Sequence, residues 1–413
     1  MKNLYKLIAV MVVVKLLTLT SAAVAQTPDI NRFIQTLWQQ SPVIHEAEAK
    51  VESTRSSHKA ASKWLYNPEV ELEAEDKDGE KKTKIIGISQ TIDWNGKFLA
   101  SGKIGAFKLE KAIAERDLVR QDLGIDVLSA LADYQTYRAV MNMATRRTAL
   151  MQNFSALAKN SFNAGDTDQS EYNLARLALS EALIQNVEAE TNLTMAKEKL
   201  NSLSGFVVQK EEDFPLLPYN LPALTFTNME FETLILKLPE IRMLQSKKDA
   251  AQAEIKLARR NKLADPTISV RGGKEEGTDL VGISLSIPLN IFNSFQAEVD
   301  VARNESLAID KSIRNALHIA KTKLIAEHRN YSLSASAWNN WRNTGDKALS
   351  EQITILDKKL KIGDLSATDY LVQIQQTLNT EIAAIELYNK TWQAWFSWLA
   401  ASGTIENWLG EIK

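Results

Sequence analysis

The fold is decided by the stretch Asn67-Pro68-Glu69-Val70-Glu71-Leu72-Glu73-Ala74-Glu75, in which acidic and apolar residues alternate without a break. Alternation with a period of two indicates a β-strand with one polar and one apolar face. A polar turn around Gly79 follows, and the alternation then resumes up to Trp94. The sequence therefore predicts a β-hairpin over about residues 67–94. Its polar face carries Glu69, Glu71, Glu73 and Glu75, and its apolar face carries Ile86, Ile88, Ile92 and Trp94.

The same plan occurs a second time in the chain. Asp265-Pro266-Thr267-Ile268 opens a second alternating segment, which predicts another hairpin over about residues 265–290. Other landmarks recur in the same order: Gly87-Ile88-Ser89 as Gly282-Ile283-Ser284, Gly165-Asp166 as Gly363-Asp364, and Ser204-Gly205 as Ser402-Gly403. The period of this duplication is far longer than the roughly 20–50 residues of solenoid repeats. Each half is therefore expected to be a complete structural unit.

A very long helix is expected after each hairpin. From Lys97 to about Phe162 there is no proline, glycine is sparse, and the apolar spacing is helical. Such a helix is about 98 Å long at 1.5 Å per residue. In the first repeat, residues 26–205, it is followed by a tip at 163–168 and a helix at 169–203. In the second repeat, residues 238–403, the corresponding segments are 294–361, 362–366 and 367–402.

The remaining segments complete this plan. Three prolines mark a linker at 206–237, and a short tail follows at 404–413. A helix of about 25 residues precedes each hairpin, and one of about 35 residues follows each tip. Stacked end to end, these shorter helices match the long helix in height, since all share the same rise per residue. The pattern predicts that they lie antiparallel to it and form a wall of even height.

Composition and motifs argue against several classes of function. The chain has 413 residues, of which 49 are basic and 51 acidic, so its net charge is −2. This balance gives no sign of a basic surface that would bind nucleic acid. It has no cysteine, which excludes disulfides, thiolate metal sites and a cysteine nucleophile. The four histidines are not spaced as a helical metal pair, and no phosphate loop or nucleophile elbow is present. We expect no catalytic residues, no bound metal and no cofactor.

The N-terminus indicates export. Lys2 and Lys6 precede an apolar core, and Ala23-Val24-Ala25 is a small-residue cleavage site, so residues 1–25 are predicted to be a signal peptide. An N-terminal membrane anchor is the alternative interpretation. No later segment offers about 18 uninterrupted apolar residues, the length of a helical membrane span.

Four one-sided strands per chain predict an oligomeric membrane barrel. Open strand edges are not tolerated in lipid, and membrane barrels need about eight or more strands. Three copies would supply twelve. Aromatic residues lie at the helical ends of the hairpins, as an interfacial belt requires, although helix–strand packing would also place them there: Trp64, Tyr66, Trp94, Phe98, Phe292 and Phe295. The expected fold class is mostly α, with a membrane β-barrel completed in a homotrimer.

These elements resemble the TolC-like outer membrane efflux protein family. The matching residues are Asn67-Pro68-Glu69, the run Gly87-Ile88-Ser89-Gln90-Thr91-Ile92-Asp93-Trp94-Asn95-Gly96-Lys97 and the duplicated Gly-Asp turns. The resemblance covers about residues 30–403 and is greatest to the heavy-metal (CzcC-like) branch. It implies a homotrimer with a 12-stranded barrel in outer membrane lipid and a long helical barrel in the periplasm. Its implied partners are a periplasmic adaptor and an inner-membrane pump of the resistance-nodulation-division class.

The resemblance also suggests roles for individual residues. The two tips are expected to meet the adaptor through Asn163, Gly165, Asp166, Thr167, Gly363, Asp364, Leu365 and Ser366. Plain capping of the helices is the alternative, since such turns need these residue types anyway. Asp369 and Glu171, just past the tips, are expected to form a periplasmic gate as rings of carboxylates, or else to lie on a solvated helix face. Glu69, Glu71, Glu73 and Glu75 are expected to line the barrel lumen, although any water-filled lumen is polar.

The function expected from the sequence is an exit duct for substrates, above all heavy-metal cations, across the periplasm and outer membrane. A duct for type I protein secretion or for drug efflux stays open, because the duct itself selects little. A periplasmic coiled-coil scaffold is a third possibility. It is disfavoured because a water-soluble scaffold would not expose four strands with apolar faces.

Overall fold

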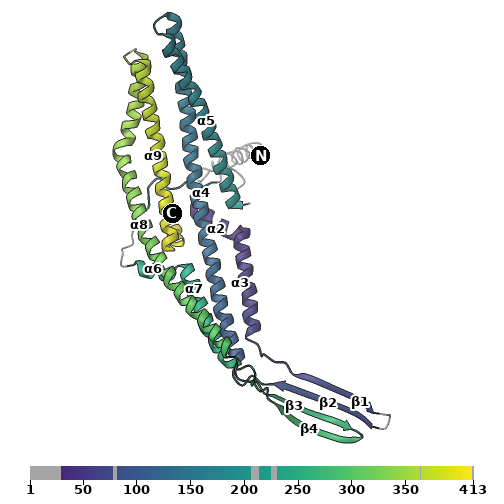
Figure 1. Cartoon of the computed structure of the whole chain (residues 1–413). Coiled ribbons are helices and arrows are strands. Elements are labelled where there is room, and N and C mark those ends of the chain that lie inside the picture. Colours follow the sequence, from purple (N-terminus) through teal and green to yellow (C-terminus); the bar gives the residue numbers. More distant parts are fainter. Residues whose placement is uncertain (1–28, 78–80, 206–213, 225–229, 363, 412–413) are drawn as a thin grey trace, which may run out of the picture.

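The computed structural model describes residues 29–77, 81–205, 214–224, 230–362 and 364–411. The predicted signal peptide lies outside these residues. Figure 1 shows an elongated molecule with a four-stranded sheet at one end and two helical tips at the other. Within the described part of the chain, each helix is too short or too polar to cross a lipid bilayer.

The first repeat contains four helices and two strands. They are α2 (Ile30–Gln40), α3 (Pro42–Ala61), β1 (Glu69–Lys77), β2 (Lys81–Thr91), α4 (Lys97–Ala164) and α5 (Gln169–Ser204). The chain turns from α4 into α5 at Gly165, which has the left-handed φ of 81° that glycine adopts without strain. Proline in the first turn of α3 is well tolerated, since the amide N–H that it lacks has no partner inside a helix at that position.

The second repeat, taken with α6 of the linker before it and α10 of the tail after it, has the same order of elements. They are α6 (Phe231–Lys237), α7 (Pro239–Asn261), β3 (Thr267–Glu275), β4 (Thr278–Ser286), α8 (Gln296–Lys361), α9 (Ala367–Ser402) and α10 (Ile405–Glu411). Of the segments expected to be equatorial, 206–213 and 225–229 lie outside the described residues. The rest of the linker contributes α6, and the tail forms α10.

The long helices form a wall in which α4 is central. With 68 residues, α4 is about 102 Å long. Helices α3 and α5 pack along one side of α4, while α7 and α9 pack between α4 and α8. The 20 residues of α3 and 36 of α5 fall short of α4 by about three helical turns. The two shorter helices therefore do not match α4 in length, contrary to the expectation from the sequence. A gap remains between α3 and α5 at the mid-height of the wall.

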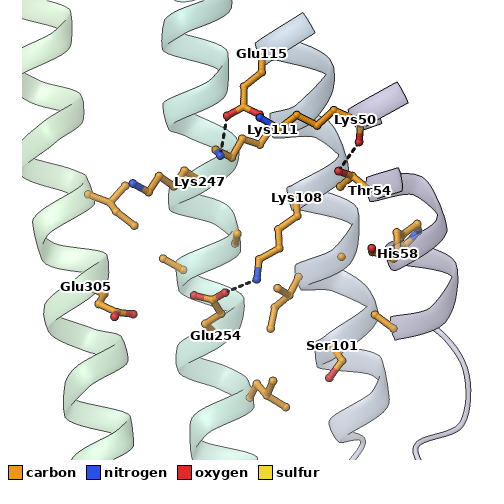
Figure 2. A pocket seen from close by; sticks show the side chains of 18 of the residues that line it. Lys50, Thr54, His58, Ser101, Lys108, Lys111, Glu115, Lys247, Glu254 and Glu305 are labelled. Atoms are coloured by element: carbon orange, nitrogen blue, oxygen red, sulfur yellow. Dashed lines mark hydrogen bonds and ion pairs between the residues drawn. The ribbon is translucent and has the colours of Figure 1, made fainter. Parts of the chain in front are cut away.

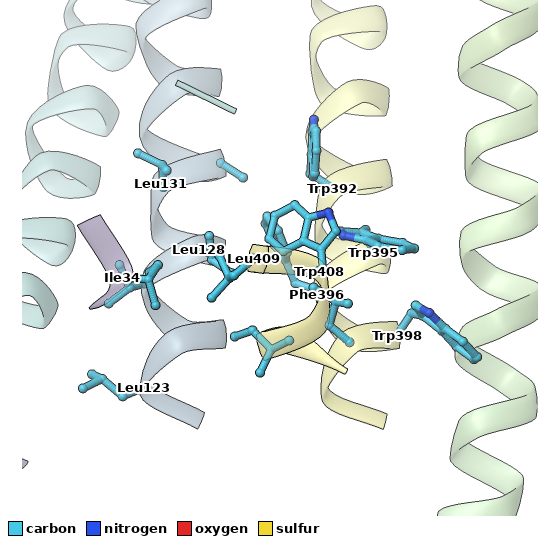
Figure 3. Packing of buried hydrophobic residues seen from close by; sticks show 14 of the residues in the cluster. Ile34, Leu123, Leu128, Leu131, Trp392, Trp395, Phe396, Trp398, Trp408 and Leu409 are labelled. Carbon is cyan, nitrogen blue, oxygen red and sulfur yellow. The ribbon is translucent and has the colours of Figure 1, made fainter. Parts of the chain in front are cut away.

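A core of aromatic and aliphatic side chains lies at that height. It receives residues from the short helices α2, α6 and α10, from the middles of α4 and α8, and from the C-terminal end of α9. Figure 3 shows Trp408 of α10 among Trp392, Trp395 and Phe396 of α9, with ring centroids 6.1–6.2 Å apart. Large aromatic side chains dominate the energetics of such a core because each removes so much apolar surface from water. The short helices at mid-height are therefore part of the packing that joins the two repeats.

A second core joins the two helical hairpins nearer their tips. Phe154 of α4 stacks on Tyr370 of α9 with centroids 5.4 Å apart. Met151, Ile374 and Leu378 are buried in the same cluster. The two hairpins are thus held together by apolar contacts close to the ends where the chain reverses.

The four strands form one antiparallel sheet in the order β1-β2-β3-β4. Its register aligns Val70 with Ile88, Ile88 with Val270, and Val270 with Ile283. The β2–β3 pairing joins the two repeats into a continuous sheet. Strands β1 and β4 are its two edges, and among the described residues each has one side without a partner strand.

A buried ion pair connects the repeats where the sheet meets the helices. The Lys97 ammonium lies 2.8 Å from the Asp265 carboxylate, and their side chains are 11% and 4% exposed. Lys97 also donates to the carbonyl of Leu263 at 2.8 Å. The Tyr66 hydroxyl donates to Asp265 at 2.8 Å. Burial, this hydrogen bond and the nearby carboxylate charges raise the pKa of Tyr66 to about 12, so the hydroxyl remains a donor at ordinary pH.

The turn from β2 into α4 is fixed by the same group of residues. Asp93 accepts hydrogen bonds from the backbone N–H groups of Lys97 and Phe98, both at 2.8 Å, and so caps the helix. Gly96 has a φ of 70°, and its carbonyl accepts from Arg260 of the second repeat. The run Asp93 to Lys97 is therefore a structural joint between the two halves of the chain.

Lys97→Met tests this joint. The substitution leaves the Asp265 carboxylate buried without its cation, and we expect the free energy of unfolding to fall by about 3–5 kcal/mol. Lys103→Met is the matched control, because Lys103 is an exposed lysine on the same helix and should change stability by less than about 0.5 kcal/mol. Thermal unfolding in detergent measures both. Equal midpoints for the two variants would contradict the assignment.

Candidate channel-forming site

The outer face of the sheet is apolar and exposed. Val281 and Ile283 of β4 are 85% and 79% exposed, and Leu72 of β1 is 77% exposed. The same face carries the other exposed branched side chains of the sheet: Val70, Ile86, Ile88, Ile268, Val270 and Leu285. A contiguous apolar surface across four strands is not stable in water and marks a site that lipid or protein covers.

The opposite face is polar and acidic. Glu69, Glu71, Glu73 and Glu75 lie in a row on β1 and share this face with Ser89, Ser269 and Ser284. On the central strand β2, Thr83, Ile85 and Ser89 are at most 8% exposed. Ile85 is an apolar residue on the polar face, which alternation alone did not predict.

Two glycines on β3 differ in what surrounds them. A β carbon on Gly273 would lie 2.0 Å from the Lys84 carbonyl oxygen, well inside any permitted contact. On its neighbour Gly272, which faces the apolar side, the nearest atom would be the Leu280 carbonyl oxygen at 3.6 Å. The close approach of β2 and β3 therefore depends on a missing side chain at Gly273.

Aromatic residues border the sheet on its helical side. Trp64 stacks on Phe98 at 5.6 Å and is 78% exposed, and Phe292 is fully exposed. Trp94 donates its indole N–H to the Ala264 carbonyl at 2.9 Å while the side chain remains 63% exposed. An apolar ring on the surface combined with a satisfied indole N–H is typical of aromatic side chains at a membrane interface.

The expected tip residues lie at the ends of the helical hairpins. Asn163, Gly165 and Asp166 are exposed and Thr167 is half-buried. In the second tip, Asp364 and Ser366 are exposed, and Leu365 packs against the nearby core. Gly363 lies outside the described residues. The tips therefore offer two short polar surfaces beyond the helices.

The two expected gate carboxylates stand in capping positions. The Asp369 backbone N–H donates to Ser366 Oγ at 3.1 Å, and the Ser366 hydroxyl donates to the Asp369 carboxylate at 2.7 Å. In the first tip, the Glu171 backbone N–H donates to Asp168 Oδ1 at 2.8 Å. Carboxylates in a first turn are also stabilised by the helix dipole. The Asp369 side chain thus has a local structural role, whereas the contact of Glu171 is made by its backbone. The N-cap Asp168 was missed although its Asp-x-x-Glu spacing indicates a capping box.

A cavity of about 970 Å³ lies between α3, α4, α7 and α8. Figure 2 shows Lys108 of α4 directed at Glu254 of α7, a 3.1 Å ion pair. Lys111 and Lys50 approach Glu115 at 2.8 and 3.7 Å. Burial raises the pKa of Glu115, but the hydrogen bonds and charges of these lysines outweigh it and leave the pKa below its usual value. The charges in this cavity connect neighbouring helices of the wall.

The comparisons with known proteins agree with this geometry. Residues 33–206 match the family model of the outer membrane efflux proteins. The chain resembles this family. That match covers the first repeat, and the second repeat carries the same order of elements. A search of curated proteins finds no match to the sequence. Among the described residues, no three histidine, aspartate or glutamate side chains are grouped to hold a metal ion.

Solved structures of outer membrane channels share the fold of this chain over 91% of its length. The CmeC channel of Campylobacter jejuni is 15% identical with a TM-score of 0.74, over 91% of this chain and 85% of that one. The open MtrE channel of Neisseria gonorrhoeae is 16% identical with a TM-score of 0.74, over 91% and 89%. CusC, described for its transmembrane channel formation, is 14% identical with a TM-score of 0.73, over 91% and 92%.

Gly273→Val tests the sheet as a unit. Its side chain would collide with the backbone of β2, at a cost of at least the 1–3 kcal/mol typical of overpacking, and we expect the folded protein in the membrane fraction to decrease. Gly272→Val is the control, since its side chain has room on the apolar face. Protease protection of the extracted protein measures both. Equal protection would show that β2 and β3 do not need this close approach.

Proposed function

We propose that this chain is the outer membrane channel component of a tripartite efflux system, with the sheet in the outer membrane and the helical wall in the periplasm. The observation that carries the proposal is the four-stranded sheet, which is apolar and exposed on one face, acidic on the other, and open at both edges. In lipid, such a sheet must close into a barrel.

Three copies of the chain would close this barrel with twelve strands, within the range of membrane barrels. A homotrimer also agrees with the exposed apolar residues on the long helices, among them Leu177, Val187 and Leu333, which are 62–68% exposed. Neighbouring copies would cover these side chains. The helical walls of three chains together would then form the periplasmic part of the duct.

The tips are the proposed contact with a periplasmic adaptor, through which an inner-membrane pump delivers substrate. Both lie at the end of the molecule farthest from the sheet (Figure 1), where an inner-membrane partner would be met. We propose heavy-metal cations as the substrate. The row of lumen-facing glutamates on β1 supports a path that favours cations. Type I protein secretion and drug efflux remain the alternatives, which differ in the pump and not in the duct.

Asp369 and Glu171 are the proposed periplasmic gate. Threefold symmetry would make each a ring of three carboxylates, and rings of like charge select cations or hold a constriction. Their capping contacts fix them at the ends of α9 and α5, where the duct opens toward the adaptor. For Asp369, whose carboxylate accepts a hydrogen bond from the Ser366 hydroxyl, the gate and the cap are two roles of one side chain.

Growth of a deletion strain tests the proposed duct. We expect sensitivity to some of zinc, cobalt, cadmium, nickel, copper and silver, and none to detergents or dyes. Sensitivity to detergents and dyes alone would replace the metal substrate by drugs. Localisation of the chain outside the outer membrane fraction would overturn the channel itself.

Two substitutions separate the tips from the wall in the same assay. Asp364→Lys reverses the charge of an exposed tip residue, and we expect it to reproduce the deletion phenotype at an unchanged amount of channel. Glu198→Lys makes the same change on an exposed position of α5 away from the tip and should restore growth. Full growth with both variants would remove the adaptor contact from this tip.

Single-channel recordings test the gate. Asp369→Ala should raise the conductance or relax the block by multivalent cations, because it removes the proposed ring of charge. Ser366→Ala removes the hydroxyl that caps α9 and leaves the carboxylate, so it should leave the block unchanged. If both variants behave alike, Asp369 acts only as a cap. The reversal potential of the same channels shows whether the lumen prefers cations, as its glutamates suggest.

A further inference from the structure

The two edges of the sheet differ in charge on the polar face. Along β1, each position on this face is a glutamate from Glu69 to Glu75. Successive residues on one face of a strand lie about 7 Å apart, so these carboxylates repel one another. Among the described residues, Glu69, Glu71 and Glu73 have no ion pair or hydrogen bond through their side chains. On β4 the same face carries no charge between Leu280 and Ser286.

Arg271 of β3 lies next to the uncharged edge. Its register row runs Glu71, Gly87, Arg271, Gly282 across the four strands. A β carbon on Gly282 would lie 3.4 Å from Nε and 3.5 Å from Cγ of Arg271. The arginine side chain therefore lies across β4 in the space that glycine leaves open.

The guanidinium of Arg271 has no partner among the described residues of its own chain. No ion pair or hydrogen bond of this side chain is found in the part of the chain that the structure describes, and the residue is exposed. Glu71 leans away from the edge of its own strand, with its carboxylate oxygen 3.7 Å from the β-carbon position of Gly87. A positive group thus reaches toward one edge of the sheet, and a row of negative groups lies along the other.

We propose that Arg271 of one chain pairs with a β1 glutamate of a second copy across a seam between β4 and β1. The proposal rests on the proposed barrel. Adjacent strands are separated by about 4.8 Å, so the strand that pairs with β4 comes within reach of a guanidinium lying over Gly282. The polar-face positions of β1 from Glu69 to Glu75 are all glutamates, so each register that brings one of these four beside Gly282 sets a carboxylate next to that guanidinium.

The same charges select how copies meet. Pairing of β1 with another β1 would set two rows of glutamates side by side, and like charges on paired strands are destabilising. Pairing of β4 with β1 sets Arg271 against the glutamates. The contact is then head-to-tail, which closes into a ring when the rotation between copies fits. Electrostatic complementarity of this kind favours the correct partner more than it adds raw stability.

Cysteine cross-linking locates the seam first. Because the chain has no cysteine, pairs can be introduced without a background. Ser284→Cys is combined in turn with Glu69→Cys, Glu71→Cys, Glu73→Cys and Glu75→Cys in the full chain. We expect one combination to form an intermolecular disulfide. In an antiparallel seam, the residue two positions after that glutamate faces Gly282. A cross-link through Glu69, Glu71 or Glu73 therefore sets a glutamate there, whereas a cross-link through Glu75 would set Lys77 there and overturn the pair. Failure of all four combinations in assembled trimers would overturn the seam.

Charge reversal then tests the pair itself. Arg271→Glu should lower the amount of detergent-resistant trimer roughly tenfold at low salt, since three exposed pairs become repulsive. In the Arg271→Glu chain, a second substitution that replaces the β1 glutamate nearest Gly282 by arginine should restore the amount of trimer. The control is Lys274→Glu, the same charge change on the same strand at the loop end, where Lys274 lies near Asp279.

The outcomes separate the two proposals. Equal amounts of trimer from Arg271→Glu and Lys274→Glu would overturn the pair while leaving the barrel in place. So would a failure of the charge-exchanged double variant to restore the trimer. Absence of trimer from the unaltered chain in the outer membrane would overturn the barrel and the seam with it. Arg271→Gln, which removes charge without adding repulsion, should fall between the unaltered chain and Arg271→Glu. Immunoblots of total chain distinguish loss of assembly from loss of protein.

Discussion

The buried pair of Lys97 and Asp265 is the contact on which the rest of the structure depends. It joins the first residue of α4 to a residue two positions before β3, and so fixes the sheet against the helical wall. A buried ion pair is weak evidence for stability, because desolvation of both charges opposes their attraction. The pair instead makes the arrangement of the two repeats specific. Each charge is stable there only when the other repeat is in place, so the two halves must join in one arrangement.

The wall shows how a duplicated chain departs from perfect repetition. Two short helices cannot cover the full length of α4. At this height α2 and α10 contact α4, α6 lies against α7, α8 and α9, and all three contribute to a tryptophan-rich core. Above and below this height, the helices contact one another through small residues and ion pairs such as Lys108 with Glu254. The heavy apolar packing is confined to mid-height and to the cluster near the tips, where the two repeats must be held together.

Much of the fold could be predicted from periodicity. Strict alternation located the hairpins, and the absence of proline from Lys97 onward located α4. What periodicity could not supply were contacts between residues far apart in sequence. In the sequence, Asp265 indicated only the start of a strand. Ile85 lies on the face of β2 that the alternation assigned to polar residues. At the tips, the candidate gate residue Asp369 carries a capping role that its spacing from Ser366 already indicated.

The sequence by itself determined the order of elements, the two faces of each strand and the duplication, because these follow from local period and turn chemistry. The tertiary structure alone decided which strands adjoin and which side chains meet across them. It placed Arg271 over Gly282 at one edge and the glutamates of β1 at the other. The reason is physical: strand order and side-chain direction depend on packing between distant segments, which no local pattern encodes.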